Sequence, residues 1–435
     1  MNKYKVKDIC NYNTRSVRGL DKDIEIQYLE TSDLTCGECS NLQPILLKNA
    51  PSRAQRLLSR DTIVYSMVRP NLCHYGYFEN PPQNLVVSTG FLTLNLKPQF
   101  IGIIDPRFLY LLLMQPWLTQ YLHTIAQNAV SSYPSLNPSD VECLCFEFPD
   151  FEVQQRIADL FFKTDRKIAL NREINRNLEA MARQLYDYWF VQFDFPDENG
   201  RPYKSSGGKM VWNEKLKREI PADWGVCSLG DYVIANNTGD WGYASESDGK
   251  TLRVGCIRGA DIVKLNDLPI RYLNNGNHSK LLNNWNIVIE VSGGSPVQAT
   301  GRSAYITPGV IERNGGKITC SNFCHAFTIR NQCDSAFFYY SWQSLYDNRN
   351  MFNFESKTSG IKNFMTETFL TIKWPDVPQK VSTQFFAVIE SIHAKIDSNI
   401  TENNSLTALR DELLPLLMNG QVSVKPTSVN CDLSD

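Results

Sequence analysis

The chain has 435 residues, and its 42% hydrophobic and 11% aromatic content is enough for about two or three packed domains and excludes global disorder. No apolar run approaches the roughly 20 residues that cross a bilayer, and the polar start contains no signal-peptide core, so we expect a cytoplasmic protein. The formal net charge of −2 excludes a protein that holds nucleic acid by bulk positive charge alone.

The first part of the chain, residues 1–149, has the pattern of a mixed α/β module. Three β-like runs at 63–66, 85–88 and 91–94 are separated by proline, glycine and asparagine, and a helix-like stretch follows at 106–127. We therefore expect a globular domain here.

Twelve cysteines are scattered over the chain, most of them singly among apolar residues, which indicates buried thiols rather than a disulfide framework. Cys36 and Cys39 have the spacing of metal ligands, but a structural zinc would need a second pair, for which only Cys73 and His74 are available. Whether Cys36 and Cys39 bind a metal stays open. A turn that carries two thiols is the simpler interpretation, and we assign no metal ligands.

A long helix is predicted at residues 150–192, because Pro149 falls just before it and no further proline occurs until Pro196. Apolar side chains recur in this segment at three- and four-residue spacing. Residues 193–221 are rich in glycine, serine, proline and lysine, and we expect a linker and surface loop there.

The same plan then repeats. Residues 222–375 predict a second α/β domain, with β-like runs at 287–290 and 324–329 and a helix-like stretch at 336–347. A second long helix is predicted at 376–419, and a C-terminal tail follows at 420–435.

The two helical segments are copies of one another, with matched residues at a single offset. The matched positions are Ile168, Asn171, Asn175 and Leu178 in the first copy and Ile396, Asn399, Asn403 and Leu406 in the second. Upstream, residues 146–150 resemble 372–376, and 61–64 resemble 285–288. The helices match well and the globular parts match poorly. The two copies therefore kept the same helical scaffold, while the sequences of their globular domains diverged.

Both helices carry an apolar stripe with near-heptad spacing, which is typical of two helices packed along their length. An amphipathic helix lying on its own domain is the alternative. We expect the eight matched positions to form a seam in which Asn171 and Asn399 are a polar pair that costs stability but fixes the register. Replacing both by leucine is then expected to raise thermal stability or to loosen the register.

No catalytic motif is found. The Gly-Gly-Lys segments at 207–209 and 315–317 lack the other residues of a phosphate loop. In Asn80-Pro81-Pro82-Gln83, Gln83 stands where an amino-methyltransferase has the aromatic residue that stacks on a flipped base. No His-x-x-x-His occurs, and Glu355-Ser356-Lys357 has no acidic partner upstream for a nuclease site. We therefore expect a binding protein and assign no catalytic residues.

Several segments carry a resemblance to a known family: 155–158, 165–171, 174–182, 185–190, 193–196, 200–208, 220–224, Ser132-Tyr133-Pro134-Ser135-Leu136 and 413–420. They resemble the specificity subunit of type I restriction–modification systems, strongly in the helical and central segments and weakly inside the globular parts. The resemblance implies tandem α/β (α+β) target-recognition domains, separated by two long antiparallel coiled-coil helices.

The resemblance also implies partners. These are double-stranded DNA, two methyltransferase (modification) subunits that methylate adenine with S-adenosylmethionine, and restriction/translocase subunits that use ATP. This chain would bind neither cofactor, and no membrane would be involved. Each domain would read one half of an asymmetric split DNA target, because the two domains differ in sequence.

Base reading needs polar or aromatic side chains on loops that can enter a groove. From loop context we expect DNA contacts from Arg15, Arg69, Asn71, Tyr75, Ser132 and Tyr133 in the first domain and from Trp241, Arg258, Ser295, Arg302, Ser359 and Lys362 in the second. The second domain has Ser359-Gly360-Ile361-Lys362 in place of the Tyr-Pro-Ser-Leu pattern. The alternative function is a coiled-coil scaffold or inhibitor that binds proteins without reading DNA.

Overall fold

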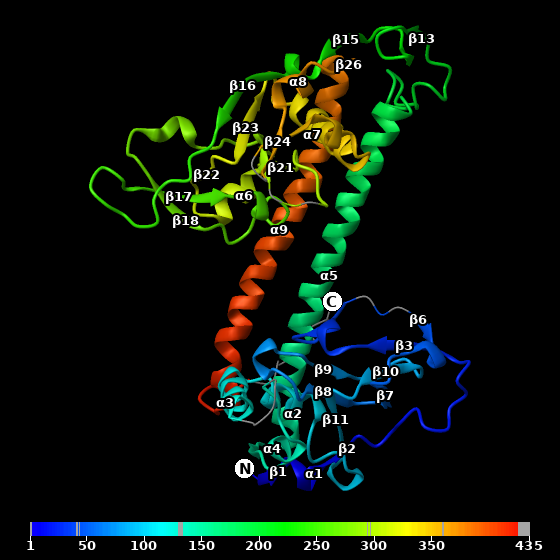
Figure 1. Cartoon of the computed structure of the whole chain (residues 1–435), viewed down its shortest axis with the longest axis vertical. Helices are drawn as coiled ribbons and strands as arrows, with labels where there is room; N and C mark the ends of the chain where they lie inside the picture. Colours follow the sequence, from blue (N-terminus) through cyan, green and yellow to red (C-terminus); the bar gives the residue numbers. More distant parts are fainter. Residues whose placement is uncertain are drawn as a thin grey trace, which may run out of the picture. The chain divides into compact units, whose positions relative to one another are not determined.

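The structure, a computed structural model, describes residues 2–40, 42, 44–128, 134–293, 295, 297–358 and 361–424. The chain divides into two compact units (Figure 1): Met1–Lys167 with Leu406–Asp435 form unit one, and Ile168–Ser405 form unit two. Each unit contains an α/β module and part of two long helices. We use module one for residues 2–150 and module two for residues 222–378. Among the described helices, none is both long and apolar enough to span a membrane.

Two long helices run through both units. Helix α5 (Phe151–Tyr186) begins in unit one and ends in unit two with a π-helical turn, η5 (Asp187–Val191). Helix α9 (Gln379–Met418) begins in unit two and ends in unit one. Both helices were predicted and are confirmed, although Pro415 lies inside α9 without ending it. Asn171 of α5 contacts Asn403 of α9, and Asn175, one turn later in α5, contacts Asn399, one turn earlier in α9. The two helices are therefore antiparallel.

Four asparagines, which we name the asparagine clasp, join α5 and α9 within unit two. The Asn399 amide donates to Asn175 Oδ1 over 2.8 Å, and the Asn171 amide donates to Asn403 Oδ1 over 3.0 Å. Asn175 and Asn403 also donate to backbone carbonyls of the opposite helix, at Ile396 and Ile168, each over 3.4 Å. The two halves of the clasp correspond residue by residue under the sequence repeat, so a local pseudo-twofold axis passes between them.

The predicted seam positions lie along this helix pair. Asn171 and Asn399 are 2% and 1% exposed, and Ile168 and Ile396 are buried beside them. Asn171 and Asn399 do not pair with each other, however, because each bonds the second asparagine of the opposite copy. Asn171 also donates to Glu402 Oε2 over 2.7 Å. In unit one the helices meet through Arg410, which donates to Asp165 over 2.9 Å.

Module one contains two four-stranded sheets. The first has the order β2 (Cys10–Tyr12), β11 (Phe91–Leu96), β8 (Thr62–Ser66) and β9 (Tyr75–Phe78), with antiparallel neighbours. The second has the order β6 (Pro44–Leu46), β3 (Glu25–Leu29), β10 (Leu85–Ser88) and β7 (Ala54–Leu57), in which β3 and β10 are parallel. Two short pairs join β1 (Asn2–Lys5) to β12 (Cys145–Phe148) and β4 (Leu34–Thr35) to β5 (Glu38–Cys39). The helices are α1 (Val6–Ile9), α2 (Pro106–Leu113), α3 (Pro116–Gln127) and α4 (Pro138–Glu142).

Module two repeats this topology except for β7, which has no counterpart in its second sheet. Its first sheet has the order β16 (Val233–Thr238), β23 (Cys324–Ile329), β19 (Ile287–Glu290) and β21 (Ser303–Tyr305), again antiparallel. Its second sheet has the order β18 (Ile270–Leu273), β17 (Leu252–Ile257) and β22 (Ile318–Cys320), which corresponds to β6, β3 and β10, with β17 and β22 parallel. Further pairing joins β20 (Ser292–Gly293), β25 (Ile361–Phe364) and β24 (Glu355–Thr358), and joins β15 (Gly225–Ser228) to β26 (Lys373–Asp376). The helices are α6 (Pro308–Arg313), α7 (Asp334–Asp347) and α8 (Thr366–Leu370).

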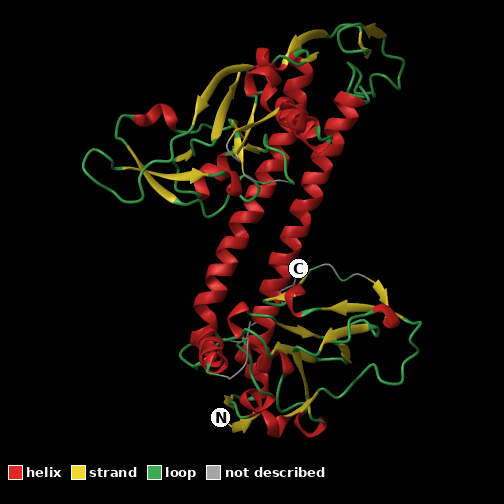
Figure 2. Ribbon diagram, viewed as in Figure 1, coloured by secondary structure: helices red, strands yellow, loops and turns green. Residues whose placement is uncertain are grey.

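Each module is layered in a similar way, with the longer helix or helices on one face of the first sheet and the second sheet on the other (Figure 2), although in module two the short helix α6 packs on the side of the second sheet. The alternation of side chains along a strand sets this arrangement. In β8, Ile63 and Tyr65 belong to the core that faces the helices, whereas Val64 faces the second sheet. In β19, Ile287 and Ile289 face the helices and Val288 faces the second sheet.

The end of each module shows where the two copies correspond. The starts of α5 and α9 differ by 228 residues (379 minus 151), and the same offset relates α4 to α8 and β12 to β26. The sequence comparison of 146–150 with 372–376 is therefore wrong by two residues, and Phe146 corresponds to Trp374. The similarity misled because Pro375 lies inside β26, whereas Pro149 follows β12.

Residues 193–221, expected to be a linker and surface loop, are folded. The Phe195 ring stacks on Tyr203 and Trp224, with centroids 4.7 and 5.2 Å away. The Asp194 carboxylate accepts hydrogen bonds from the Ser205 backbone and hydroxyl over 2.7 and 2.6 Å. The hairpin of β13 (Met210–Asn213) and β14 (Arg218–Pro221) completes the segment. Composition alone did not reveal these aromatic contacts.

The asparagine clasp predicts how stability responds to leucine substitutions. Asn175→Leu with Asn399→Leu removes both members of one contact, so the melting temperature should stay level or rise. Asn171→Leu with Asn399→Leu removes one member from each contact and leaves Asn175 and Asn403 with fewer buried partners. We expect that pair to lose about 1–3 kcal/mol per orphaned amide. Thermal denaturation of the full chain measures both, and a mismatched pair more stable than the matched pair would contradict the clasp.

Candidate nucleic-acid interface

In module one, two segments distant in sequence meet beyond the end of β8. Val68 and Ser135 form an antiparallel bridge, the Leu136 N–H donates to Met67 O over 2.8 Å, and the Arg69 N–H donates to Pro134 O over 2.9 Å. Arg69 has a φ of 49°, in the left-handed region, where it begins the short helix η3 (Pro70–Leu72). Arg69 and Asn71 are exposed on this loop. Ser132 and Tyr133 lie outside the described residues.

Module two has the corresponding pair of segments beyond β19. Ser292 pairs with Asn363, and the Phe364 N–H donates to Val291 O over 2.7 Å. Ser295 lies on this loop, where its hydroxyl accepts from the Gln298 N–H over 3.2 Å. Ser359 is outside the described residues. Leu136 and Phe364 make the same backbone contact, so Lys362 corresponds to Pro134, and the Ser359–Lys362 stretch is shifted from the Tyr-Pro-Ser-Leu pattern.

Two cations predicted to contact DNA are engaged inside module two. The Arg302 guanidinium donates to both carboxylate oxygens of Glu290 over 2.7 and 2.8 Å, and this hydrogen-bonded carboxylate raises the pKa of Arg302. Lys362 is 7% exposed, and its ammonium lies 3.2 Å from Glu355. Burial opposes ionisation of Glu355, yet the Thr300 N–H and Lys362 lower its pKa. The placement of Arg302 and Lys362 on a DNA-facing surface is therefore corrected, since both neutralise partly or fully buried acids.

Tyr75 is also corrected, because it is 6% exposed and belongs to the core that faces the helices. Its ring stacks on Tyr65 with centroids 5.8 Å apart. Arg258 is exposed, although it donates to both carboxylate oxygens of Asp261 over 2.7 and 2.9 Å. The pair is bidentate and the Asp261 side chain is only 16% exposed, so Asp261 holds the Arg258 guanidinium in place.

Arg15 and Trp241 occupy corresponding places, each on the segment that makes the first crossing from the first sheet to the second. Arg15 follows β2, is exposed, and donates to Leu58 O over 3.1 Å. Trp241 follows β16 and is half-buried, with the Arg271 guanidinium 4.4 Å from its ring centroid. Sequence reasoning missed Arg271, because β18 brings it to Trp241 from about thirty residues away.

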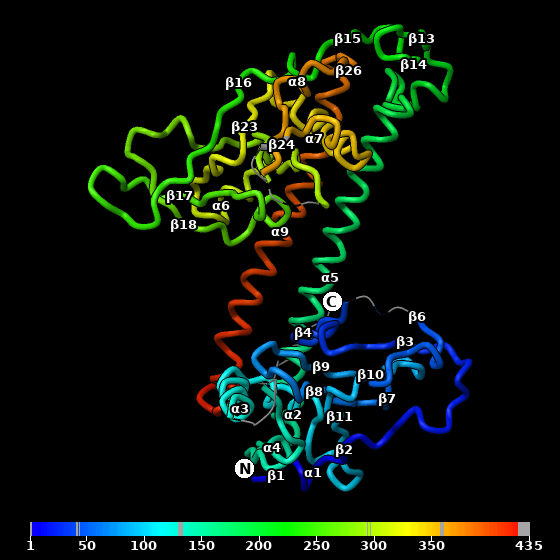
Figure 3. Tube along the Cα trace, viewed as in Figure 1, coloured from blue at the N-terminus to red at the C-terminus, as the bar shows by residue number. Residues whose placement is uncertain are grey.

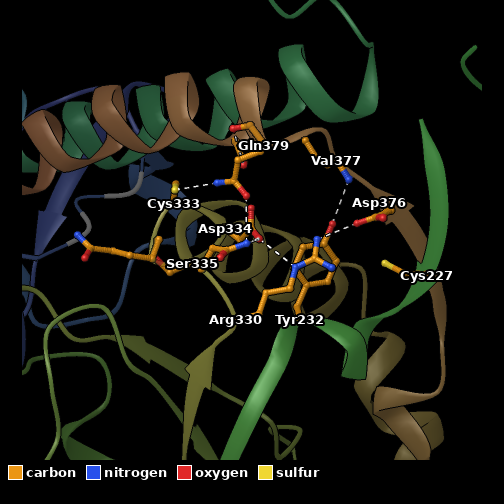
Figure 4. A network of polar contacts seen from close by, with 12 residues as sticks. Cys227, Tyr232, Arg330, Cys333, Asp334, Ser335, Asp376, Val377 and Gln379 are labelled. Atoms are coloured by element: carbon orange, nitrogen blue, oxygen red, sulfur yellow. Dashed lines mark hydrogen bonds and ion pairs between the residues drawn. The ribbon is translucent and has the colours of Figure 1, made fainter. Parts of the chain in front are cut away.

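A polar network fixes the start of α9 to module two (Figure 4). Arg330 donates to Asp334 and Asp376 over 3.0 and 2.7 Å, and its guanidinium lies 4.2 Å from the Tyr232 ring centroid. Burial opposes its charge, but the two carboxylates raise the pKa of Arg330. Gln379, the first residue of α9, donates to Cys333 Sγ over 2.9 Å.

Module one has a similar attachment to α5. Arg107 bonds Asp105 and also Asp159 of α5, over 2.7 and 2.6 Å, while Gln154 of α5 accepts from the Asp105 N–H over 3.0 Å. Module one is therefore joined to α5 by an ion pair, whereas in module two the Arg330 ion pairs order the residues beside the start of α9 and Gln379 makes the direct contact.

The two thiols with metal-ligand spacing lie on the turn between β4 and β5. Cys36 and Cys39 are both exposed, and the Cys36 N–H donates to Cys73 O over 2.9 Å. Although both residues are exposed, neighbouring protein atoms partly desolvate the two sulfurs and raise the pKa of both thiols. No group of three or more His, Cys, Asp or Glu side chains with metal-binding geometry occurs in the described part of the chain.

The buried ion pair predicts that Arg302 acts on stability. Arg302→Met leaves the Glu290 carboxylate buried without its cation and should cost about 3–5 kcal/mol. Combining it with Glu290→Leu removes both charges and should recover most of the loss. Asn71→Ala, on an exposed loop, should change stability by no more than about 0.5 kcal/mol. Denaturant unfolding of the full chain measures all three, and an unchanged Arg302→Met variant would return Arg302 to the DNA-facing set.

Comparisons with known proteins agree with these features. The family model for the type I restriction modification DNA specificity domain matches residues 1–180. The HindI type I restriction enzyme specificity subunit of Haemophilus influenzae is 24% identical over 442 residues, covering 91% of this chain and 94% of that protein. The MjaIX specificity subunit of Methanocaldococcus jannaschii is 24% identical over 385 residues, covering 85% of this chain and 79% of that protein.

A solved structure, the S subunit of a type I restriction–modification system from M. genitalium, is 15% identical, with a TM-score of 0.57 over 98% of this chain and 96% of that chain. This likeness supports the fold. The family model over residues 1–180 and the two relatives, whose similarity extends over most of the chain, show that this protein is similar to type I restriction–modification specificity subunits.

Proposed function

We propose that this chain is the DNA-reading subunit of a type I restriction–modification complex, and that each module reads one half of an asymmetric split target. The observation that carries the proposal is the pair of modules with the same strand order but unlike loops. A shared frame suits two readers of one kind of ligand. Unlike loops suit two different half-site sequences.

The loops available for reading differ in chemistry between the modules. Module one presents Arg15, Arg69 and Asn71, whereas module two presents Trp241, Arg258 and Ser295. Arginine and asparagine form paired hydrogen bonds with guanine and adenine edges, respectively. The formal net charge of −2 also suggests that partner subunits supply part of the positive charge that neutralises DNA phosphates.

We further propose that catalysis belongs to those partners. Two modification subunits would bind S-adenosylmethionine and methylate adenine, and restriction subunits would use ATP to translocate and cleave DNA. This division is supported by the similarity to type I specificity subunits and by the lack of catalytic motifs in the sequence. The purified chain would then turn over neither cofactor.

The alternative, a protein-binding scaffold or inhibitor, differs in one measurable respect. A DNA reader gains sequence-selective binding to duplex DNA when its methyltransferase partner is present. A scaffold of modification subunits leaves the choice of DNA sequence to them.

Exchange of module one tests the proposal. Residues 1–150 are replaced by the corresponding module of a relative, with the junction before Phe151 so that β1 remains paired with β12. Methylated adenines are then mapped by sequencing in cells that carry the partner subunits. The native chain should give a two-part motif, and the exchange should change one half of it and leave the other half intact.

The matched control uses the same module of the relative, but with its exposed loops replaced by the loop sequences of the native module one. It should restore the native motif. A change in both half-sites, or in neither, would show that the modules do not read independently, and a motif insensitive to this chain would favour the scaffold.

A further inference from the structure

In each module, one segment makes the first crossing from the first sheet to the second. Connector one, residues 13–24, links β2 to β3, and connector two, residues 239–251, links β16 to β17. The two connectors correspond because the strands at their ends occupy the same places in the sheet order. Figure 3 traces connector two between the labels β16 and β17.

The backbone of connector two is held in place by neighbouring strands. Tyr243 and Tyr272 exchange two backbone hydrogen bonds, of 2.9 and 3.0 Å. Gly242 has a φ of 61°, and a Cβ there would lie 2.7 Å from Tyr272 O, so this close approach requires glycine. The Asp240 carboxylate accepts from the Gly242 N–H over 2.9 Å and from the Asn277 amide over 2.9 Å. The connector is thus irregular but well restrained.

Two aromatic side chains in connector two, Trp241 and Tyr243, each have a cation close to the ring. The Lys250 ammonium lies 3.6 Å from the Tyr243 ring centroid, and the Arg271 guanidinium lies 4.4 Å from that of Trp241. Arg271 also donates to the carbonyls of Trp241 and Gly242 over 2.9 and 3.0 Å, so it positions Trp241. Tyr243 is 44% exposed.

Nucleic acids are bound by this combination of groups. Cations neutralise phosphates, and aromatic rings pack against bases or sugars. Arg253, beside Tyr272 across β17 and β18, adds an exposed cation. Glu246 and Asp248 lie on the same connector and are also exposed, so contact through particular side chains suits this surface better than bulk charge.

We propose that connector two contacts double-stranded DNA and determines the half-site of module two, with Tyr243 and Lys250 touching DNA and Arg271 acting as the positioning residue. This inference rests on the proposed function. It assigns specificity to a connector that lies in sequence before the loops beyond β19.

Connector one supports the same assignment independently. Arg15 and Arg18 are exposed on it. Arg15 also lines a surface hollow of about 490 Å³, whose other walls are Leu20, Ile24, Ile26, Leu57, Gln83 and Asn84. An arginine beside two side-chain amides above an apolar floor provides the donors and acceptors that read base edges. Gln83 belongs to the Asn80-Pro81-Pro82-Gln83 segment, which lacks the aromatic residue of a methyltransferase motif.

The test uses the full chain assembled with its modification subunits. Tyr243→Ala and Lys250→Ala, alone and combined, are compared with the native chain for binding to a duplex that carries the mapped target. The combined variant should weaken binding about tenfold or more and relax the sequence requirement in the half-site of module two only. Lys250→Ala alone should lower the salt dependence by about one phosphate contact. Arg271→Lys keeps the charge and should relax the same half-site, because lysine cannot make both hydrogen bonds while stacking on Trp241.

Trp212→Ala and Lys215→Ala are the matched controls, because they remove the same kinds of group from the exposed β13–β14 hairpin, where Trp212 is 58% exposed. They should leave the target unchanged, and melting temperatures should show that Tyr243→Ala is folded. Native recognition of a split target with Tyr243 and Lys250 variants indistinguishable from the controls would overturn this inference alone. A native complex without sequence selectivity would overturn the proposed function itself.

Discussion

The pairing of α5 with α9 is the constraint on which the rest of the structure depends. Each helix begins directly after one module and takes part in both compact units, so its register determines which residues of the two copies meet. An apolar seam alone permits sliding by a turn at modest cost. The asparagine clasp removes that freedom, because a one-turn slip would leave four amides in an apolar seam without their partners.

The modules add a second constraint, which acts where each helix starts. In module two, Arg330 joins Asp334 of α7 to Asp376 of β26, next to the first turn of α9. In module one, Arg107 joins Asp105 to Asp159 of α5. The buried carboxylates of Asp105 and Asp334 tolerate few alternative arrangements, since displacement would leave each without its cation. In module one the Arg107–Asp159 ion pair restrains the module against α5, and in module two the Arg330–Asp376 ion pair orders the residues that lead into α9.

Much of the frame could be predicted from the sequence. The spacing of Ile168, Asn171, Leu178 and their copies indicated two long helices, and the β-like runs at 63–66 and 287–290 became β8 and β19. The partners of the asparagines could not be predicted, because repeated sequence shows which residues correspond and not which residues touch. In an antiparallel pair each asparagine meets the other member of the opposite copy.

The DNA-facing residues were harder to predict for a related reason. Lys362 and Arg302 look like surface cations in the sequence, but the strands bring Glu355 and Glu290 to them and turn them inward. Tyr75 follows a loop in the sequence, but it is the first residue of β9 and its side chain points into the core that faces the helices. Arg271 had no signal of its own, because its stacking on Trp241 arises only from tertiary structure. Side-chain direction thus identifies residues with structural roles where composition does not.

We propose that the paired helices space the two modules along the DNA, and lengthening both helices tests this claim most directly. Four residues are inserted between Lys167 and Ile168 of α5 and four between Ser405 and Leu406 of α9, at the two points where the chain passes between compact units, so that the asparagine clasp and both modules stay intact. Each insertion adds about 6 Å of helix, or roughly two base pairs of duplex. Mapping of methylated adenines should show both half-sites unchanged and the unread gap between them longer by about one or two base pairs. An unchanged gap in a folded, active complex would contradict the claim that the helix pair sets the spacing between two independent readers.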